Sequence, residues 1–230
     1  MDWHWKALGL AVLLVAMVML PGCAPEAART TPESDRQESA DDLAVPAVPT
    51  LPPTTTVTTA GNPCGVRPIV VPTPAPDPGY TGLDPSTGLH VTGKIQLLDL
   101  STYRLRVTGS VQRPLELTYD ELRCLPKVQA APALVCPGFF VDQAAWAGVP
   151  IADVLGLAGV QDGAQSVRFV SADGYTTSLA LEEALDRTNF LAYEWEGQPL
   201  PRLHGFPLRV VIPGAEGNQW TKWVVEMVVR

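Results

Sequence analysis

The chain has 230 residues, of which 46% are hydrophobic and 17% are charged, and its 16 Lys and Arg against 24 Asp and Glu give a net charge of −8. This length and composition allow a folded domain with a sizeable core and a long appendage. An acidic chain without basic runs is a poor nucleic-acid binder, because Lys and Arg supply most of the affinity for phosphates. We therefore exclude nucleic acid as a partner.

The first expected element is an export signal. The apolar run at residues 7–20 is too short for a comfortable transmembrane helix of about 20 residues, and it stands where a signal sequence belongs. Gly22 and Cys23 follow it, and a small residue before a cysteine at this place resembles the bacterial lipoprotein cleavage and acylation site. We expect a signal peptide at residues 1–22, lipidation of Cys23 and an extracytoplasmic protein that is lipid-anchored to the cell membrane. An uncleaved signal anchor and a secreted protein are the alternatives.

Residues 23–88 are expected to form a disordered linker rich in Pro and Thr, with residues 45–59 as its purest part. Such a segment cannot bury enough apolar surface to offset the entropy that it would lose on ordering. It would act as a tether that holds a folded domain away from the lipid. The alternative, that part of it packs on the domain, is open for the end around Cys64 to Val71.

The folded domain is expected at residues 89–230. Alternating or β-branched runs predict strands, and apolar residues at helical spacing predict helices. Thr118 with Glu121 three residues later predicts a capping box, and Gly159 predicts a helix stop. Short helices between strands, without a regular β-α-β alternation, indicate an α+β domain. The expected strands are 103–111, 166–172, 206–214 and 221–229, and the expected helices are 117–125, 149–160 and 179–186.

Four stretches carry a resemblance to a known family. In chain order they are "LVCPGFFVDQAAWAGVPIADVLGLAGV", "SADGYTTSLALEEAL", "LAYEWEGQPLPRLHGFPLRVVIPG" and "GNQWTKW". Their order and spacing resemble the molybdopterin-binding domain of the sulfite oxidase family, which includes the periplasmic methionine-sulfoxide reductase catalytic subunit. The resemblance covers residues 103–229. It implies a mixed-sheet, sulfite-oxidase-like α+β fold and an oxidoreductase that uses a molybdenum–molybdopterin cofactor.

The resemblance also implies roles for individual residues. Cys136 matches the one protein ligand to molybdenum, and a soft thiolate suits such a metal. Tyr175 matches a position on the rim of the catalytic pocket. A buried pterin phosphate needs local cations, because an unpaired buried charge is costly. The positions implied to contact the cofactor are His204, Arg209 and Lys222, together with Gly214 and Gly217, whose backbones would approach it closely.

The chain departs from the family pattern in several places. Apolar Phe139 and Phe140 follow Cys136 in place of a stretch with arginine and asparagine, so we do not expect a sulfite-specific pocket. Gln219 stands where the family often has a basic residue, and His90 is the one candidate for an upstream histidine-containing pterin segment. The signal lacks the twin arginines of the route that exports folded proteins, and the carboxy-terminal domain of larger members does not follow.

Besides Cys23, the chain has three cysteines. An odd number leaves one thiol unpaired in an oxidising compartment. A disulfide between Cys64 and Cys124 would leave Cys136 free, as a metal ligand must be. One alternative is that Cys124 is a plain core residue. The other is that Cys136 is itself disulfide-bonded, which would exclude the molybdenum role.

The resulting hypothesis is an exported, membrane-anchored, molybdopterin-dependent oxidoreductase domain. It would exchange an oxygen atom with a small-molecule substrate at a molybdenum ligated by Cys136. Its electrons would pass to an external carrier such as a haem protein, because the chain has no CxxCH haem motif. The alternatives are a cofactor-free binding or interaction module that retains the fold, and a thiol redox protein that uses Cys136 directly.

Overall fold

The computed structural model describes residues 56–57 and 64–230. The expected signal peptide, the lipidation site Cys23 and most of the expected tether lie outside these residues. Among the described residues, no helix has both the length and the apolar character needed to cross a membrane.

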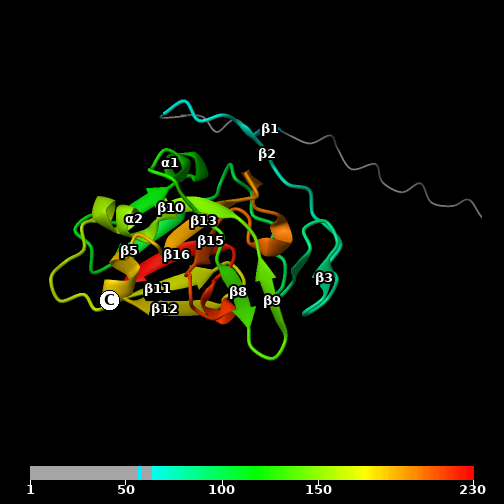
Figure 1. The fold of residues 1–230 in the computed structure, drawn as a ribbon. Coiled ribbons are helices and arrows are strands. Elements are labelled where there is room, and N and C mark those ends of the chain that lie inside the picture. The colour runs from blue at the N-terminus through cyan, green and yellow to red at the C-terminus, as the bar shows by residue number, and fades with distance from the viewer. Residues whose placement is uncertain (1–55, 58–63) are drawn as a thin grey trace, which may run out of the picture. The chain divides into compact units, whose positions relative to one another are not determined.

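The first five-stranded sheet is mixed, and its middle strand is the one nearest the C-terminus (Figure 1). The strand order is β12-β11-β16-β5-β6; β5 and β16 run parallel and the other neighbours are antiparallel. Residues in β5 and β11 alternate between buried and more exposed positions, as their sequence pattern predicts. The bounds are β5 Leu105–Gly109, β6 Leu115–Leu117, β11 Ser166–Ser171, β12 Thr176–Ala180 and β16 Val224–Val229.

The second five-stranded sheet is antiparallel and more deeply buried. Every residue of its strand β10 is buried, as are the first residues of its neighbour β13. The order is β14-β13-β10-β7, and β15 also pairs with β13. The bounds are β7 Val128–Ala130, β10 Trp146–Pro150, β13 Phe190–Trp195, β14 Gln198–Pro199 and β15 Arg209–Val211. One hydrophobic cluster joins side chains of both sheets, so the two sheets share a core.

Three short helices connect the strands, as expected. In the first, the Thr118 hydroxyl accepts from the Glu121 amide at 3.1 Å and the Glu121 carboxylate accepts from the Thr118 amide at 2.7 Å, which confirms the capping box. The second helix ends at Gly159, whose φ of 69° is easy for glycine and strained for other residues. The bounds are α1 Tyr119–Arg123, α2 Ile151–Ala158 and α3 Leu181–Leu185, with 3-10 turns η1 Arg202–His204 and η2 Gly217–Gln219.

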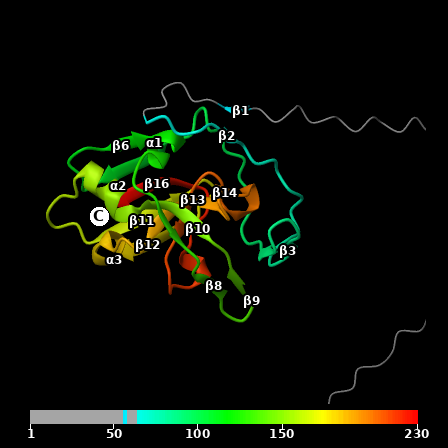
Figure 2. The ribbon, with the colours of Figure 1, turned by 45° about the horizontal axis from the view of Figure 1, so that its top comes forward.

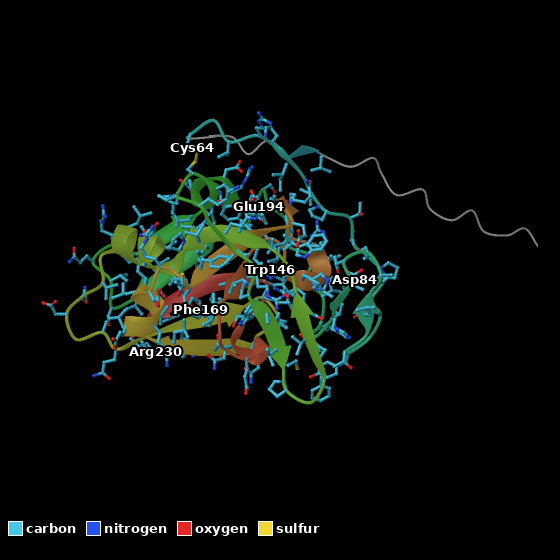
Figure 3. All side chains as sticks on the ribbon, in the orientation of Figure 1. Cys64, Asp84, Trp146, Phe169, Glu194 and Arg230 are labelled. Carbon is cyan, nitrogen blue, oxygen red and sulfur yellow. A yellow bond between two sulfur atoms is a disulfide. The ribbon has the colours of Figure 1, made fainter. Side chains whose placement is uncertain are left out.

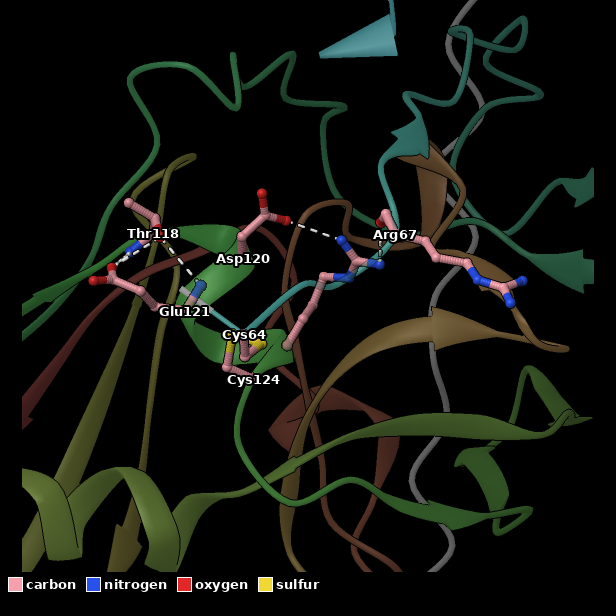
Figure 4. The surroundings of a disulfide bond; sticks show 7 residues. Cys64, Arg67, Thr118, Asp120, Glu121 and Cys124 are labelled. Carbon is pink, nitrogen blue, oxygen red and sulfur yellow. Dashed lines mark hydrogen bonds and ion pairs between the residues drawn. A yellow bond between two sulfur atoms is a disulfide. The ribbon is translucent and has the colours of Figure 1, made fainter. Parts of the chain in front are cut away.

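The expected boundary at residue 89 is too late. A disulfide joins Cys64 to Cys124 beside α1, and the Arg123 guanidinium donates to the Arg67 carbonyl at 2.8 Å (Figure 4). The side chains of Ile69 and Val71 pack against the core. Residues from 64 onward therefore belong to the folded domain, which confirms the alternative left open for Cys64 to Val71 and extends it. The additional strands are β1 Thr56–Val57, β2 Ile69–Val70, β3 Leu83–Asp84 and β4 Leu89–His90.

A hairpin that the sequence did not predict surrounds Cys136. Strands β8 (Ala133–Cys136) and β9 (Phe140–Gln143) pair so that Cys136 lies opposite Phe140, and the hairpin projects from the body of the domain (Figures 1 and 2). Its outer face carries the exposed side chains of Val135 and Val141. Because side chains alternate along a strand, Cys136 and Phe140 lie on the opposite, inner face.

Two expected strands are shorter than their patterns suggested. The strand expected at 206–214 is limited to Arg209–Val211, because Gly205 has a φ of 113° and Pro207 has no amide to donate to a ladder. The strand expected at 221–229 begins only at Val224, since Trp223 has a φ of 50°. The segment between these strands is irregular, and it carries several of the residues that were expected to bind the cofactor.

Candidate functional site

A cavity of about 320 Å³ lies where the hairpin, the segment after β3 and the irregular segment before β16 meet. Its lining combines aromatic side chains with a thiol, several hydroxyls and both signs of charge. The lining residues are Tyr80, His90, Thr92, Gly93, Leu134, Cys136, Phe140, Ser171, Asp173, Tyr175, Arg209, Gly217, Asn218, Trp220, Thr221, Lys222 and Trp223. The structure therefore brings together Cys136, Tyr175, Arg209, Gly217 and Lys222 from the expected set.

Arg209 is the cavity's permanent cation. Its Cζ lies 4.9 Å from the Trp146 ring centre and 5.6 Å from that of Trp220, and Trp146 is buried near the centre of the domain (Figure 3). Burial lowers the pKa of Arg209 to about 9, although the carboxylate of Asp142 opposes the shift. In the described part of the chain, the guanidinium has one hydrogen bond, from Nη1 to the His204 carbonyl at 3.3 Å, and its buried Nε has no partner.

Lys222 places a second buried amine at the same cavity. Its Nζ lies 4.5 Å from the Trp223 ring centre and donates to the carbonyls of Thr92 and Leu203. Burial lowers the pKa of Lys222 to about 7, with the nearby Arg209 charge acting in the same direction. Among the described residues, neither Lys222 nor Arg209 forms an ion pair with a carboxylate.

Cys136 supplies the cavity's thiol. The Cys64–Cys124 disulfide leaves it free, and its side chain is partly buried at the end of β8. Over the residues that the structure describes, no three His, Cys, Asp or Glu side chains gather in a way that could hold a metal ion by themselves. Ligation of a metal by Cys136 stays a prediction of the family resemblance.

His204 lies behind the cavity and is not among its lining residues. Its Nε2 is 3.0 Å from the Asp84 carboxylate and 2.9 Å from the Thr87 hydroxyl, and the ring is almost fully buried. Burial lowers its pKa to about 4, with the charges of Arg209 and Lys222 acting in the same direction. The imidazole of His204 is thus neutral at pH 7. The backbone carbonyl of His204 accepts a hydrogen bond from Arg209 and so helps to position the guanidinium. Direct contact between its ring and the cofactor stays a prediction.

The remaining expected residues have different roles in the geometry. Tyr175 lines the cavity, is half exposed, and donates its hydroxyl to the Asn218 carbonyl at 2.8 Å. A Cβ on Gly217 would lie 3.0 Å from a methyl carbon of Leu134, so this glycine lets η2 approach β8 closely. Gly214 does not line the cavity; its φ of 86° indicates a turn position.

His90 is a cavity residue to which the sequence gave little weight. It lies at the end of β4, and its ring stacks on Phe140 with 4.4 Å between centroids and 8° between planes. Thr92 and Gly93, also from the segment before residue 103, complete this wall. In the sequence, His90 could have been singled out only because histidine is rare, since residues 89–230 contain just His90 and His204.

The site fits a phosphate-bearing pterin and its metal. In the part of the chain that the structure describes, Arg209 and Lys222 are buried at the cavity without an ion pair to a carboxylate, and the buried Nε of Arg209 has no hydrogen-bond partner. Buried cations are stable only when paired, so this arrangement favours an anionic ligand. A guanidinium also offers a planar, bidentate grip on phosphate. The free thiol of Cys136 lines the same space, and a thiolate is the type of ligand that a soft metal prefers.

Comparisons with known proteins agree with this geometry. The family model described as oxidoreductase molybdopterin binding domain matches residues 92–230. A sulfite oxidase of Arabidopsis thaliana is 34% identical over 169 residues, which cover 57% of this chain and 43% of that protein. The uncharacterized oxidoreductase YuiH of Bacillus subtilis is 33% identical over 127 residues, covering 55% of this chain and 64% of that protein.

The crystal structure of the sulfane dehydrogenase SoxCD from Paracoccus pantotrophus is similar in fold and sequence. It has a TM-score of 0.56 and 29% identity, with 61% of this chain and 41% of that chain covered. The chain therefore spans less than half the length of the plant sulfite oxidase and of the SoxCD chain.

Proposed function

We propose that this chain, which belongs to the oxidoreductase molybdopterin-binding domain family, uses its cavity for oxygen-atom exchange with a small molecule at a molybdenum ligated by Cys136. The observation that carries the proposal is the pair of buried, carboxylate-free cations beside a free thiol. Within the described residues, Arg209 and Lys222 are buried without an ion pair to a carboxylate, which disfavours their charges, and an anionic cofactor would supply the missing negative charge.

Each residue has a defined task in this proposal. Arg209 and Lys222 bind the pterin and its phosphate, and contacts with the rings of Trp146 and Trp220 help to hold the Arg209 guanidinium in place. Cys136 ligates the metal as a thiolate. When bound, the molybdenum–molybdopterin cofactor supplies two-electron redox chemistry and oxygen-atom transfer, while the protein supplies orientation and electrostatics.

The inner face of the hairpin shapes the substrate side of the cavity. Phe140 lines it, whereas Phe139 is largely exposed and absent from the lining. The two phenylalanines supply no cation next to Cys136, so we propose a substrate other than sulfite itself. Tyr175 is proposed to contact this small molecule at the rim. The electrons are proposed to leave for an external carrier such as a haem protein.

We further propose that the protein is exported and anchored to the outer side of the cell membrane through a lipid on Cys23. The Cys64–Cys124 disulfide supports an oxidising, extracytoplasmic location, because disulfides persist there and are rare in the cytosol. Metabolic labelling with a radioactive fatty acid tests the anchor: Cys23→Ser should lose the label and leave the membrane fraction. Equal labelling of both proteins would refute lipidation at Cys23.

The cofactor is tested by elemental analysis for molybdenum and by fluorescence of oxidised pterin, on protein purified from a host that makes the cofactor. The expected result is close to one of each per chain. Cys136→Ser should lose the metal, whereas a Cys64→Ser and Cys124→Ser double variant should keep it after correction for folded protein. Absence of metal and pterin from the wild-type protein would overturn the proposal and favour the cofactor-free binding module.

A further inference from the structure

One carboxylate holds His90 in a fixed position at the cavity wall. Asp142 on β9 accepts the His90 Nδ1 hydrogen with Oδ1 at 2.7 Å and the His90 backbone amide with Oδ2 at 2.7 Å. A carboxylate only accepts hydrogen bonds, so the proton of the neutral imidazole lies on Nδ1. The Asp142 side chain is 6% exposed, which shields this pair from competing water. Nε2 is consequently left with a free lone pair.

Stacking on Phe140 fixes the plane of the same ring. The contact to Asp142 and the contact to Phe140 come from the same strand, and together they prevent the imidazole from turning away. Within the described residues, Nε2 has no hydrogen-bond partner, and the His90 side chain is 31% exposed. The ring is therefore oriented by the protein while its reactive nitrogen stays available to a ligand and to solvent.

The position of the ring links it to the expected reaction. Phe140 is the cross-strand partner of Cys136, and His90, Phe140 and Cys136 line one cavity. The wall of this cavity thus carries an acceptor nitrogen as well as the residue proposed to hold the metal. An imidazole whose other nitrogen donates to a carboxylate is the usual arrangement of a general base, because the carboxylate fixes the tautomer and stabilises the protonated ring.

We propose that His90 is a catalytic residue of this cavity, whose Nε2 accepts a proton from the water that provides the transferred oxygen atom. The proposal rests on the function proposed above. Oxidation of a substrate S follows S + H2O → SO + 2H⁺ + 2e⁻. The electrons leave one at a time to the external haem carrier, and each proton passes through Nε2 of His90 to solvent. Substrate reduction reverses both flows.

Other groups at the cavity contribute to its pH dependence. Asp142 faces His90 directly from β9. The further titratable or charged groups that line the cavity are Tyr80, Cys136, Asp173, Tyr175, Arg209 and Lys222. Their presence means that a pH profile by itself cannot identify the base. Variants that change Nε2 alone are needed.

A simpler explanation for the pair is that it attaches β4 to the hairpin. His90→Asn separates the two roles, since the Asn side-chain amide can still donate to Asp142 while Nε2 is removed. Asp142→Asn keeps the shape of the carboxylate and weakens its control of the tautomer. Val141→Thr is a matched control, because Val141 lies on the same strand and its side chain is exposed on the outer face.

The first readout needs no cofactor. Long-range proton–nitrogen NMR of the imidazoles reports which ring nitrogen carries the proton. We expect the Nδ1–H form for neutral His90 in the wild-type chain and a mixture of both forms in Asp142→Asn. A wild-type ring protonated on Nε2 would overturn the proposal, because that nitrogen would then be unable to accept.

The second readout uses the cofactor-loaded chain and no substrate. After reduction by dithionite and removal of excess reductant, the protein is mixed with ferricyanide, which takes the electrons, and a pH dye follows proton release. We expect His90→Asn to keep its molybdenum and to release protons about 100-fold more slowly, within the usual contribution of a general base. Added imidazole should restore part of the rate to His90→Gly, and Val141→Thr should match the wild type.

The outcomes distinguish this proposal from the one on which it rests. A loaded His90→Asn protein that releases protons within about twofold of the wild-type rate would overturn the role of His90 and leave the cofactor proposal intact. A wild-type chain without molybdenum would overturn both. Loss of molybdenum from His90→Asn alone, with a normal melting curve, would make His90 a cofactor-binding residue and would also refute the proposal.

Discussion

Lys222→Met in the cofactor-free domain offers a direct test of the cavity's electrostatics. The pKa of Lys222 falls from its usual 10.5 to about 7, because burial disfavours the charged amine and Arg209 adds to the effect. Between these pH values the unfolded chain binds a proton that the folded chain has lost. The free energy of unfolding of the wild-type chain therefore rises with pH in this range.

The expected size of the effect follows from the shift. Each pH unit within the range adds up to about 1.4 kcal/mol, so Lys222 should contribute about 3 kcal/mol of added stability as the pH is raised from about 6 to about 9. Lys222→Met lacks this titration. Over the same pH range, the free energy of unfolding of the wild-type chain should accordingly rise by about 3 kcal/mol relative to that of Lys222→Met. Lys222→Met also loses the hydrogen bonds to Thr92 and Leu203, but this cost is the same at every pH and does not affect the comparison.

Chemical unfolding at several pH values, followed by tryptophan fluorescence, measures this difference. Both proteins should carry Cys136→Ala, so that the free thiol does not exchange with the Cys64–Cys124 disulfide at high pH. Titrating groups that do not interact with Lys222 cancel in the comparison, and His204, whose pKa the charge of Lys222 helps to lower to about 4, titrates below this pH range. A stability difference that stays constant between about pH 6 and about pH 9 would refute the conclusion that burial lowers the pKa of Lys222.

Three further predictions concern other parts of the domain. Arg209→Met should lower cofactor retention, measured as molybdenum per folded chain, at least about tenfold. It should not lower the free energy of unfolding of the cofactor-free domain at neutral pH. Cofactor retention at the wild-type level would contradict the proposed role of Arg209. Asp84→Ala should lower the free energy of unfolding by about 1–3 kcal/mol, because the partners of a buried carboxylate become unsatisfied. Reducing the Cys64–Cys124 disulfide, which spans 60 residues, should cost about 2–4 kcal/mol. Unchanged denaturation midpoints would refute the last two.

Local signals predicted much of the fold. The Thr118–Glu121 capping box, the stop at Gly159 and the alternating strand at Ser166–Ser171 each depend on residues close in sequence, and the structure confirms them. The domain start was wrong, because composition describes the average of a segment. The Pro-rich segment contains the short strands β2 and β3, whose contacts are with distant residues: Ile69 packs against the core and Asp84 contacts His204.

The functional site was also predictable only in part, because contacts between residues far apart in the chain define it. The resemblance to the sulfite oxidase family singled out Cys136, Arg209 and Lys222, and the structure places them at one cavity. The contacts that define their environment join residues far apart in the chain, such as His204 with Asp84 at a separation of 120 residues. No local sequence pattern predicts such a pair. The contact between His90 and Asp142, which are 52 residues apart, was not predicted for the same reason.

The place of β16 in the first sheet determines when this protein can fold. The strand lies between β11 and β5, so neither neighbour has its full set of hydrogen bonds until residues up to Val229 have left the ribosome. Arg209 and Lys222 also belong to this late part of the chain. A complete cofactor site therefore requires synthesis of the whole domain, and a nascent chain that lacks β16 leaves the facing edges of β5 and β11 without their partner strand.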